Sequence, residues 1–242
     1  MMKTLLLSTA MVAAGATASV AQGFTGAELG LEFQSFNDLD ENTTAYFGGA
    51  EFEIVPQFAV AADVSFYSNS ASDDNANNFT LHGIYKFGGP RTGVGLFVGQ
   101  DSIDDGDLDV FGLEGAFDFG QGHIEGFFGS ADTEDNSDIT FAGLEFEYDL
   151  GSGIGVIGGF DRFDLEVGAD EFSITTLEIG GSYLVADMVT IFGKIGTIEL
   201  DAEDIGSDDD SFISIGAEIG FGPDQGLTFS PRSIFSSAPL AF

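Results

Sequence analysis

The feature that most constrains this chain is an alternation of apolar and polar side chains that runs from residue 24 to about residue 222. Between Gly26 and Phe33, for example, every second residue is apolar, and the residues between them are Gly or Glu. Because successive side chains of a β-strand point to opposite faces, this period indicates strands with one apolar and one polar face. The pattern predicts twelve strands, at about residues 24–36, 43–54, 58–68, 78–87, 93–101, 108–119, 122–131, 138–150, 153–167, 171–185, 187–199 and 211–222.

The lengths of these segments and of their connections favour a membrane barrel. The segments exceed the 5–6 residues usual in soluble domains and reach the roughly 9–11 residues that cross a hydrocarbon layer. Short turns, such as Pro56–Gln57 and 151–153, alternate with mostly longer acidic loops, such as 102–107 and 200–210. This layout is typical of outer-membrane proteins. We predict an all-β fold, namely an antiparallel transmembrane β-barrel of about twelve strands. Its turns on the periplasmic side are predicted to be short, and its extracellular loops longer and acidic. Between ten and fourteen strands are compatible with the pattern.

A secreted soluble β-sandwich is the alternative fold, because its strands also alternate apolar and polar residues, with the apolar face turned inward. Aromatic residues at both ends of the strands favour the barrel, because they resemble the girdles at the two membrane interfaces. One further irregularity is expected in segment 153–167, where the alternation slips near Asp161 and Arg162 and indicates a β-bulge.

The composition excludes several classes of function. Only 6 Lys and Arg residues oppose 41 Asp and Glu residues, and the formal net charge is −35. A nucleic-acid partner is excluded, because such binding requires clustered cations. The chain has no cysteine and only two histidines, His82 and His123, which lie in no recognisable nucleophile motif. We therefore expect no enzymatic activity.

The N-terminus is predicted to be an export signal. Lys3 precedes an apolar run that is too short to span a bilayer, and the segment ends in Ser19-Val20-Ala21. The predicted organisation is a cleaved signal peptide at 1–21, a transmembrane barrel at 22–222 and a C-terminal periplasmic tail at 223–242. The predicted location is the outer membrane of a Gram-negative bacterium. Expected partners are the barrel-assembly machinery and outer-membrane lipids, including lipopolysaccharide.

A Gly-x-Glu unit recurs near the middle of five predicted strands, beginning at Gly26, Gly49, Gly112, Gly143 and Gly216. A carboxylate that faced lipid at this depth would be costly, so the Glu face is expected to point inward. The glycines would thin the wall and leave room for water. The predicted pore-lining residues are Glu28, Glu32, Glu51, Glu53, Asp63, Lys86, Glu114, Glu125, Glu145, Glu147, Asp161, Glu178, Lys194 and Glu218. The predicted lipid-facing residues are Leu29, Leu31, Phe52, Val60, Leu113, Leu144, Ile191 and Ile215.

An acidic interior favours a pore that passes ions and small hydrophilic solutes by diffusion and prefers cationic or neutral solutes. Twelve strands give a narrow passage, which inward Phe97, Phe127, Phe141 and Phe192 would occlude in part. Two alternatives stay open. One is a plugged barrel whose interior charges are paired internally. The other is a non-conducting structural or surface barrel with acidic loops that bind divalent cations.

The acidic loops supply a further hypothesis. Ca²⁺ prefers six to eight oxygen ligands, and residues 101–109 are dense in carboxylates. We therefore consider the hypothesis that this loop binds Ca²⁺ or Mg²⁺. The ligands would be Asp101, Asp104, Asp105, Asp107 and Asp109. A solvated acidic rim is the alternative reading of the same residues. No other cofactor is expected.

The chain resembles Gram-negative porins, particularly those of the alphaproteobacterial type. The resemblance rests on the leader from Met1 to Ala21, on residues 23–30 that follow it, and on the terminal Phe242. It implies passive passage of solutes across the outer membrane. Porins of that type usually have sixteen strands, an inward constriction loop and a trimeric assembly, whereas this chain is too short for sixteen strands and shows no such loop. Its oligomeric state stays open. Pro239 interrupts the approach to Phe242, so the tail either carries a weak assembly signal or folds back.

Overall fold

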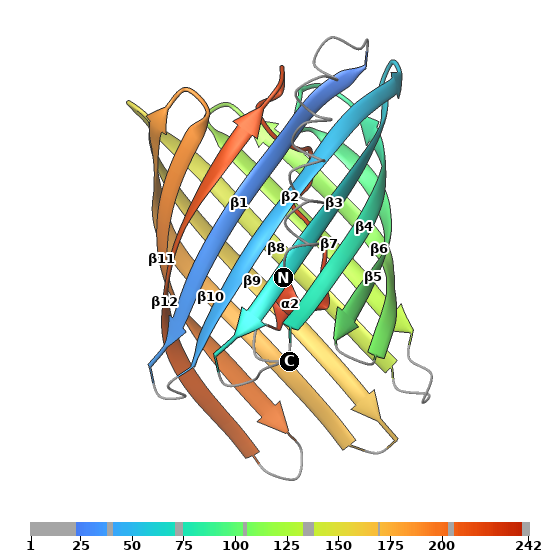
Figure 1. The fold of residues 1–242 in the computed structure, drawn as a ribbon, viewed down its shortest axis with the longest axis vertical. Helices are drawn as coiled ribbons and strands as arrows, with labels where there is room; N and C mark the ends of the chain where they lie inside the picture. The colour runs from blue at the N-terminus through green and yellow to red at the C-terminus, as the bar shows by residue number, and fades with distance from the viewer. Residues whose placement is uncertain are drawn as a thin grey trace, which may run out of the picture.

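The computed structural model describes residues 23–37, 41–70, 75–103, 106–132, 138–168, 170–202 and 206–238. They form one closed antiparallel β-barrel of twelve strands (Figure 1). The strands are β1 (Phe24–Phe36), β2 (Asn42–Val55), β3 (Phe58–Asn69), β4 (Asn75–Lys86), β5 (Gly93–Ile103), β6 (Gly106–Phe119), β7 (Gly122–Asp132), β8 (Asp138–Gly151), β9 (Ile154–Val167), β10 (Asp170–Ala186), β11 (Val189–Ala202) and β12 (Gly206–Phe221). A short helix, α2 (Ile234–Ser237), follows the last strand.

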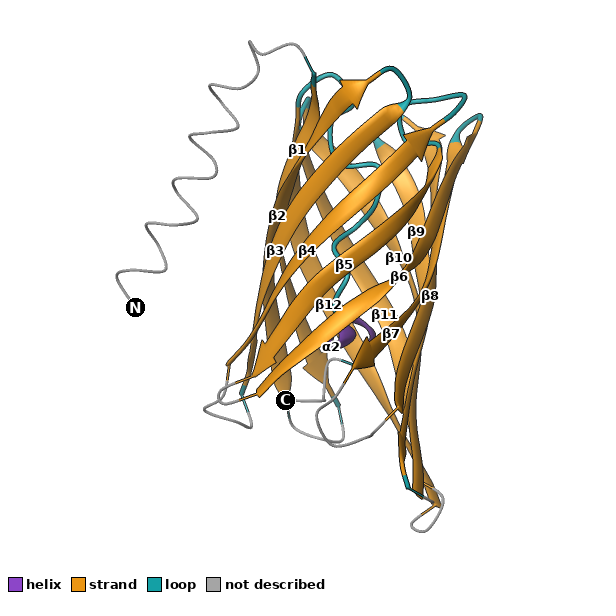
Figure 2. Ribbon diagram, turned by 90° about the vertical axis from the view of Figure 1, so that its right-hand side faces the viewer, coloured by secondary structure: helices purple, strands orange, loops and turns teal. Residues whose placement is uncertain are grey.

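Each strand pairs with its neighbours in the sequence, and β1 closes the barrel by pairing with β12, from Ala27 opposite Phe221 to Phe36 opposite Phe212. The predicted fold class and strand number are confirmed. The connections β2–β3, β4–β5, β6–β7, β8–β9 and β10–β11 lie at one end of the barrel, called the turn end here, and the other connections lie at the opposite end, called the loop end; the turn end is at the top of Figure 2. The predicted contrast in length holds only in part, because two residues separate β5 from β6 and β9 from β10, whereas six separate β4 from β5.

Two details differ from the sequence prediction. Strand β12 begins at Gly206 rather than at residue 211, because Asp208, Asp209 and Asp210 pair with β11 although they carry no apolar alternation. The predicted bulge near Asp161 is wrong, because the pairing of β9 with both neighbours is continuous there. Arg162 simply points outward, where it is exposed and pairs with Asp164 at 2.6 Å.

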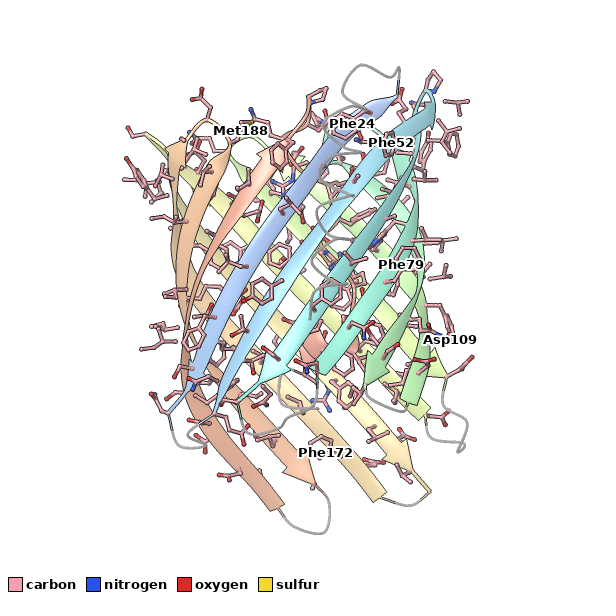
Figure 3. All side chains as sticks on the ribbon, in the orientation of Figure 1. Phe24, Phe52, Phe79, Asp109, Phe172 and Met188 are labelled. Carbon is pink, nitrogen blue, oxygen red and sulfur yellow. The ribbon has the colours of Figure 1, made fainter. Side chains whose placement is uncertain are left out.

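Large apolar side chains cover the outside of the barrel (Figure 3). All eight residues predicted to face lipid lie on this outer face; six of them are among its exposed apolar residues, and Leu29 and Phe52 are half-buried. No helix among the residues described here is long and apolar enough to cross a membrane.

Leu144 provides a test of this orientation, because it lies near the middle of β8 and its side chain is 48% exposed. Leu144→Arg is expected to destabilise the folded barrel by about 2–4 kcal/mol, as arginine does on the lipid face at mid-depth. Leu150→Arg is the matched control, because Leu150 lies at the turn end and should cost only about 0–1 kcal/mol. Urea titration of the protein folded in lipid vesicles, followed by gel mobility, measures the free energy of unfolding of both variants. An equal loss of stability in the two variants would contradict the placement of Leu144 on the lipid face at mid-depth.

The interior has two layers. Toward the loop end, apolar side chains from many strands form a buried cluster that includes Phe97, Phe141, Phe163 and Phe212. Polar and charged side chains, including Glu51, lie in the middle and at the turn end, together with a smaller apolar cluster that includes Ala61 and Ile84. Helix α2 lies inside the barrel in both views (Figures 1 and 2), so the segment that follows β12 must enter the interior.

Candidate functional site

The chain reverses direction after Phe221 and enters the barrel from the turn end. The reversal uses positive φ angles at Gly222 (86°) and Gly226 (149°), which glycine adopts without strain, and also at Gln225 (54°). Asp224 donates its backbone N–H to the carbonyl oxygen of Thr25 at 2.9 Å. From Gly226 to Phe229 every residue is buried. The predicted periplasmic location of the tail is therefore wrong for the described residues 226–238; residues 239–242 lie outside the described part of the chain.

Glycines in the barrel wall make room for this tail. A Cβ atom on Gly26 would overlap the carbonyl oxygen of Gly226, and one on Gly49 would lie 2.8 Å from Cδ1 of Leu227. These two glycines belong to the Gly-x-Glu units, and phenylalanine rings occupy the space beside the other three units. The expectation that these glycines leave room for water is therefore wrong. They leave room for the tail and for aromatic rings.

Carboxylates of the wall accept hydrogen bonds from the backbone of the tail. The N–H of Thr228 donates to Glu51 at 2.9 Å, and the N–H of Ser230 donates to Glu125 at 2.9 Å. Nearer the loop end, the N–H of Ile234 donates to Asp101 at 2.8 Å. These bonds satisfy backbone donors that would otherwise be buried without partners.

Arg232 is the main charged anchor of the tail, and its side chain is 1% exposed. Its guanidinium contacts the carboxylates of Glu114, at 3.1 Å, and of Glu125, at shorter range, and it lies 3.8 Å from the carboxylate of Glu145. The face of the guanidinium covers the ring of Phe127, with 4.3 Å between Cζ and the ring centroid. Burial disfavours the charged guanidinium, but the carboxylates of Glu125 and Glu114 outweigh it and raise the pKa of Arg232 above its ordinary value. The tail therefore supplies a permanent positive charge to the interior.

Two other inward carboxylates on β2 to β7, Glu51 and Asp63, are also paired. Lys86 bridges Glu51 at 2.8 Å and Asp224 at 2.9 Å. The ring of His82 lies between Asp63 at 2.6 Å and Glu114 at 2.7 Å. This side of the interior is thus filled by the tail, and Glu51, Asp63 and Glu114 each contact a basic side chain or a histidine.

An open cavity of about 540 Å³ remains on the other side, mainly along β8 to β12 and β1. Its lining extends from Glu218 and Ser182 near the turn end to Gln34 and Thr43 near the loop end. Three basic side chains reach it: Arg91, Lys194 and Arg232. Nine carboxylates line it, namely Glu28, Glu32, Glu125, Glu145, Glu147, Asp161, Glu178, Glu218 and Asp224. Among the described residues, the cavity is therefore strongly acidic.

Lys194 compensates only part of this charge. Its Nζ lies 2.8 Å from Glu32 and 2.9 Å from Glu178, and 5.4 Å from the ring centroid of Phe192. Arg91, on the turn between β4 and β5, lies 3.4 Å from Glu147. Burial disfavours the charge of Arg91, but Glu147 and Glu125 outweigh it and raise the pKa of its guanidinium.

The structure divides the predicted pore-lining residues into two overlapping groups, because Glu28 and Glu145 both line the cavity and contact the tail. One group faces the tail or its partners: Glu51, Asp63, Lys86, Glu114 and Glu125. The second group lines the cavity: Glu28, Glu32, Glu145, Glu147, Asp161, Glu178, Lys194 and Glu218, together with Glu125 of the first group. Glu53 belongs to neither, because it is exposed at the turn end.

Sequence reasoning missed the inward role of Arg91 and Arg232. A signal for the tail was present, because no acidic residue follows Asp224 in a chain that is otherwise strongly acidic. A segment of 18 residues with one arginine and no carboxylate is a suitable partner for an acidic interior.

The predicted metal site is not assembled among the residues that the structure describes. Asp101 is fully buried inside the barrel, where it accepts hydrogen bonds from Asn78 at 2.7 Å and Ser233 at 2.8 Å, so its assignment as a loop ligand is wrong. Asp107 accepts a hydrogen bond from Ser102, and Asp109 one from Gln100. Asp104 and Asp105 lie outside the described residues. Within the described ranges, no three His, Cys, Asp or Glu side chains are grouped so that they could hold a metal ion.

Comparison with known proteins gives the family. The sequence profile of Gram-negative porins matches residues 81–203. The solved KdgM porin is similar in fold, with a TM-score of 0.54 and 9% identity over 80% of this chain and 99% of that one. An outer-membrane channel from Pseudomonas putida is similar too, with a TM-score of 0.58 and 12% identity over 84% of this chain and 98% of that one. The comparison with curated protein sequences gave no match.

The two kinds of similarity have different weight. At 9% and 12% identity, the solved structures establish a shared fold and nothing finer. The profile covers half of the chain, from β4 to the start of the loop after β11. Together with the closed barrel, its apolar exterior and its carboxylate-lined cavity, this match shows that the chain belongs to the Gram-negative porin family of outer-membrane channels.

Proposed function

We propose that the protein is a pore for passive diffusion of ions and small hydrophilic solutes, and that it prefers cations. The route is the cavity between the tail and the wall formed by β8 to β12 and β1. The observation that carries the proposal is the lining of this cavity, where nine carboxylates face three basic side chains. Carboxylates along a narrow passage concentrate cations and repel anions.

The distribution of ion pairs supports the same route. Glu51, Asp63 and Glu114 are paired with basic side chains or histidine on the tail-filled side, so they add little to the field in the passage. The carboxylates of Glu28, Glu145 and Asp161 face the cavity, where Lys194 is engaged by two other acids. The excess negative charge therefore lies along the open side.

The size of the solutes follows from the packing. The tail occupies the space that a twelve-strand barrel would otherwise leave open, and the rings of Phe127 and Phe192 line what remains. We expect inorganic cations and small hydrophilic molecules to pass and larger solutes to be excluded. Export through a cleaved leader at residues 1–21 belongs to the proposal; that segment lies outside the described residues.

A non-conducting barrel is the second candidate. It is favoured by the buried apolar cluster at the loop end, where Phe97, Phe141 and Phe212 pack with Phe235 of the tail. Such a barrel would be a structural element of the outer membrane. The two candidates differ in a single property, which is transport.

Solute entry into liposomes tests the proposal. Vesicles that contain the folded protein are mixed with lysine or with glutamate, two small hydrophilic solutes of opposite net charge. We expect lysine to enter faster than glutamate, because the acidic lining attracts one and repels the other. Faster entry of glutamate would refute the cation preference, and entry no faster than into protein-free vesicles would favour the non-conducting barrel.

A further inference from the structure

We propose that the inner wall of the barrel from β2 to β10 is a binding site for a peptide with the pattern Phe-x-x-Arg-x-x-Phe, whose last residues form one helical turn. Its present occupant is the protein's own segment from Leu227 to Ala238, which acts as a tethered ligand. The proposal concerns binding and does not depend on whether the barrel conducts.

The tail is separate from the barrel in its architecture. Every strand is hydrogen-bonded to two neighbouring strands, so the wall closes without any residue after Phe221. The tail adds no strand to this sheet, and a single turn at residues 222–226 connects it to β12. The barrel and the tail therefore have the relation of a receptor and a ligand joined by a linker.

The wall recognises the main chain of the tail at spaced positions. Carboxylates accept the N–H groups of Thr228, Ser230 and Ile234, and the hydroxyl of Thr80 donates to the carbonyl oxygen of Arg232 at 2.8 Å. Contacts of this kind hold the main chain of a peptide whatever its side chains are, as in other modes of peptide recognition. Pro231, next to Arg232, restricts the conformations of the free segment and lowers the entropy lost on binding.

Three side chains spaced three residues apart supply the specificity. Phe229 is buried in a cluster with Ala59, Ala61, Ile84 and Ala116, and its ring stacks on His82 with 6.3 Å between centroids. A Cβ on Gly95 would lie 2.7 Å from this ring, so a glycine is needed there. At the C-terminal end of the pattern, the ring of Phe235 packs on the ring of Tyr67, with 5.7 Å between the two ring centroids.

Arg232 lies between these two aromatic pockets in its own cage of three glutamates and one ring. The guanidinium reaches Glu114 with Nε and Glu125 with Nη2, while its face covers Phe127. Lysine has a single point charge and no planar face, so it would not reproduce these contacts. The site is therefore suited to an arginine peptide with aromatic residues three positions on either side.

The tether strengthens binding without adding contacts, because a short linker holds the ligand at an effective concentration in the millimolar range. A free peptide must therefore compete with the tethered segment. Cutting the linker removes this advantage and makes the intrinsic affinity measurable.

The experiment uses the full chain with a protease site inserted after Gly222, which is exposed. The protein is folded first and then cut, and a labelled peptide with the sequence of residues 223–242 is added. We expect the cut segment to stay bound and to be displaced by the native peptide. The peptides Arg232→Gln and Arg232→Lys should compete more than about tenfold less well, as expected for a buried anchor residue. A Ser236→Ala peptide is the matched control, because Ser236 is exposed, and it should compete like the native peptide.

Four results would overturn the proposal. They are unfolding of the barrel after the cut, loss of the segment without rebinding of the native peptide, failure of the native peptide to displace the segment, and equal competition by the Arg232→Gln peptide. If the insertion prevents folding, the uncut chain with Ser237→Cys gives the same information, because the natural sequence has no cysteine and Ser237 is buried. Excess native peptide should then accelerate thiol labelling of that cysteine, and the Arg232→Gln peptide should not; no acceleration by the native peptide overturns the proposal.

Discussion

Arg232→Gln is expected to release the tail from the barrel while the barrel itself stays closed. The substitution removes the guanidinium from the buried carboxylates of Glu125 and Glu114, of which Glu114 keeps its contact with His82. Breaking a buried ion pair in this way costs about 3–5 kcal/mol. Since about 1.4 kcal/mol corresponds to a factor of ten, the population with a released tail should rise by at least a hundredfold. The barrel is expected to survive, because its strand pairing does not involve the tail.

Thiol labelling measures this release. Ser237→Cys places a reporter at a position that is fully buried inside the barrel. Its labelling rate should rise strongly when Arg232→Gln is added. Arg162→Gln is the matched control, because Arg162 lies on the outer surface and pairs with Asp164 there, so it should leave the rate unchanged. Equal labelling rates in the two variants would show that Arg232 does not hold the tail.

Neutralising the open side of the interior is expected to have the largest effect on selectivity. The triple variant Glu145→Gln, Asp161→Asn, Glu178→Gln removes three of the nine carboxylates that line the cavity. We expect the ratio of cation to anion permeability to fall severalfold, because the cation concentration in the passage depends exponentially on the local potential. Permeability ratios from bilayer recordings measure the effect.

The matched control removes the same charge from another place. Glu53→Gln, Asp107→Asn and Asp109→Asn also neutralise three carboxylates, but none of these residues lines the cavity. The permeability ratio should stay close to that of the natural protein. A similar fall in both triple variants would mean that selectivity depends on net charge and not on the cavity.

The wall of the barrel was largely predictable from the sequence, because the faces of a strand are set by its local alternation. Leu29, Leu144 and Ile215 lie on the outer face, and Glu51 and Glu114 point inward. The acidic extension of β12 was missed because Asp208–Asp210 pair with β11 by backbone hydrogen bonds and carry no hydrophobic signal.

The contents of the interior were less predictable, because they depend on contacts between residues far apart in the sequence. Asp101 resembled a loop ligand in the sequence, but the strand continues through it and Ser233 of the tail is its partner. Glu51 and Glu145 were equivalent members of the same Gly-x-Glu repeat, yet one pairs with Lys86 and the other lines the cavity. Only the course of the tail separates these roles, and the sequence allowed both a tail outside the barrel and one that folds back.

The reversal potential of the natural protein in a planar bilayer under a KCl gradient tests most directly whether the barrel is a cation-preferring pore. A narrow passage lined by an excess of carboxylates predicts discrete current steps whose reversal potential is displaced toward that of K⁺. A displacement toward the reversal potential of Cl⁻, or a bilayer that stays silent although the barrel is folded, would contradict it.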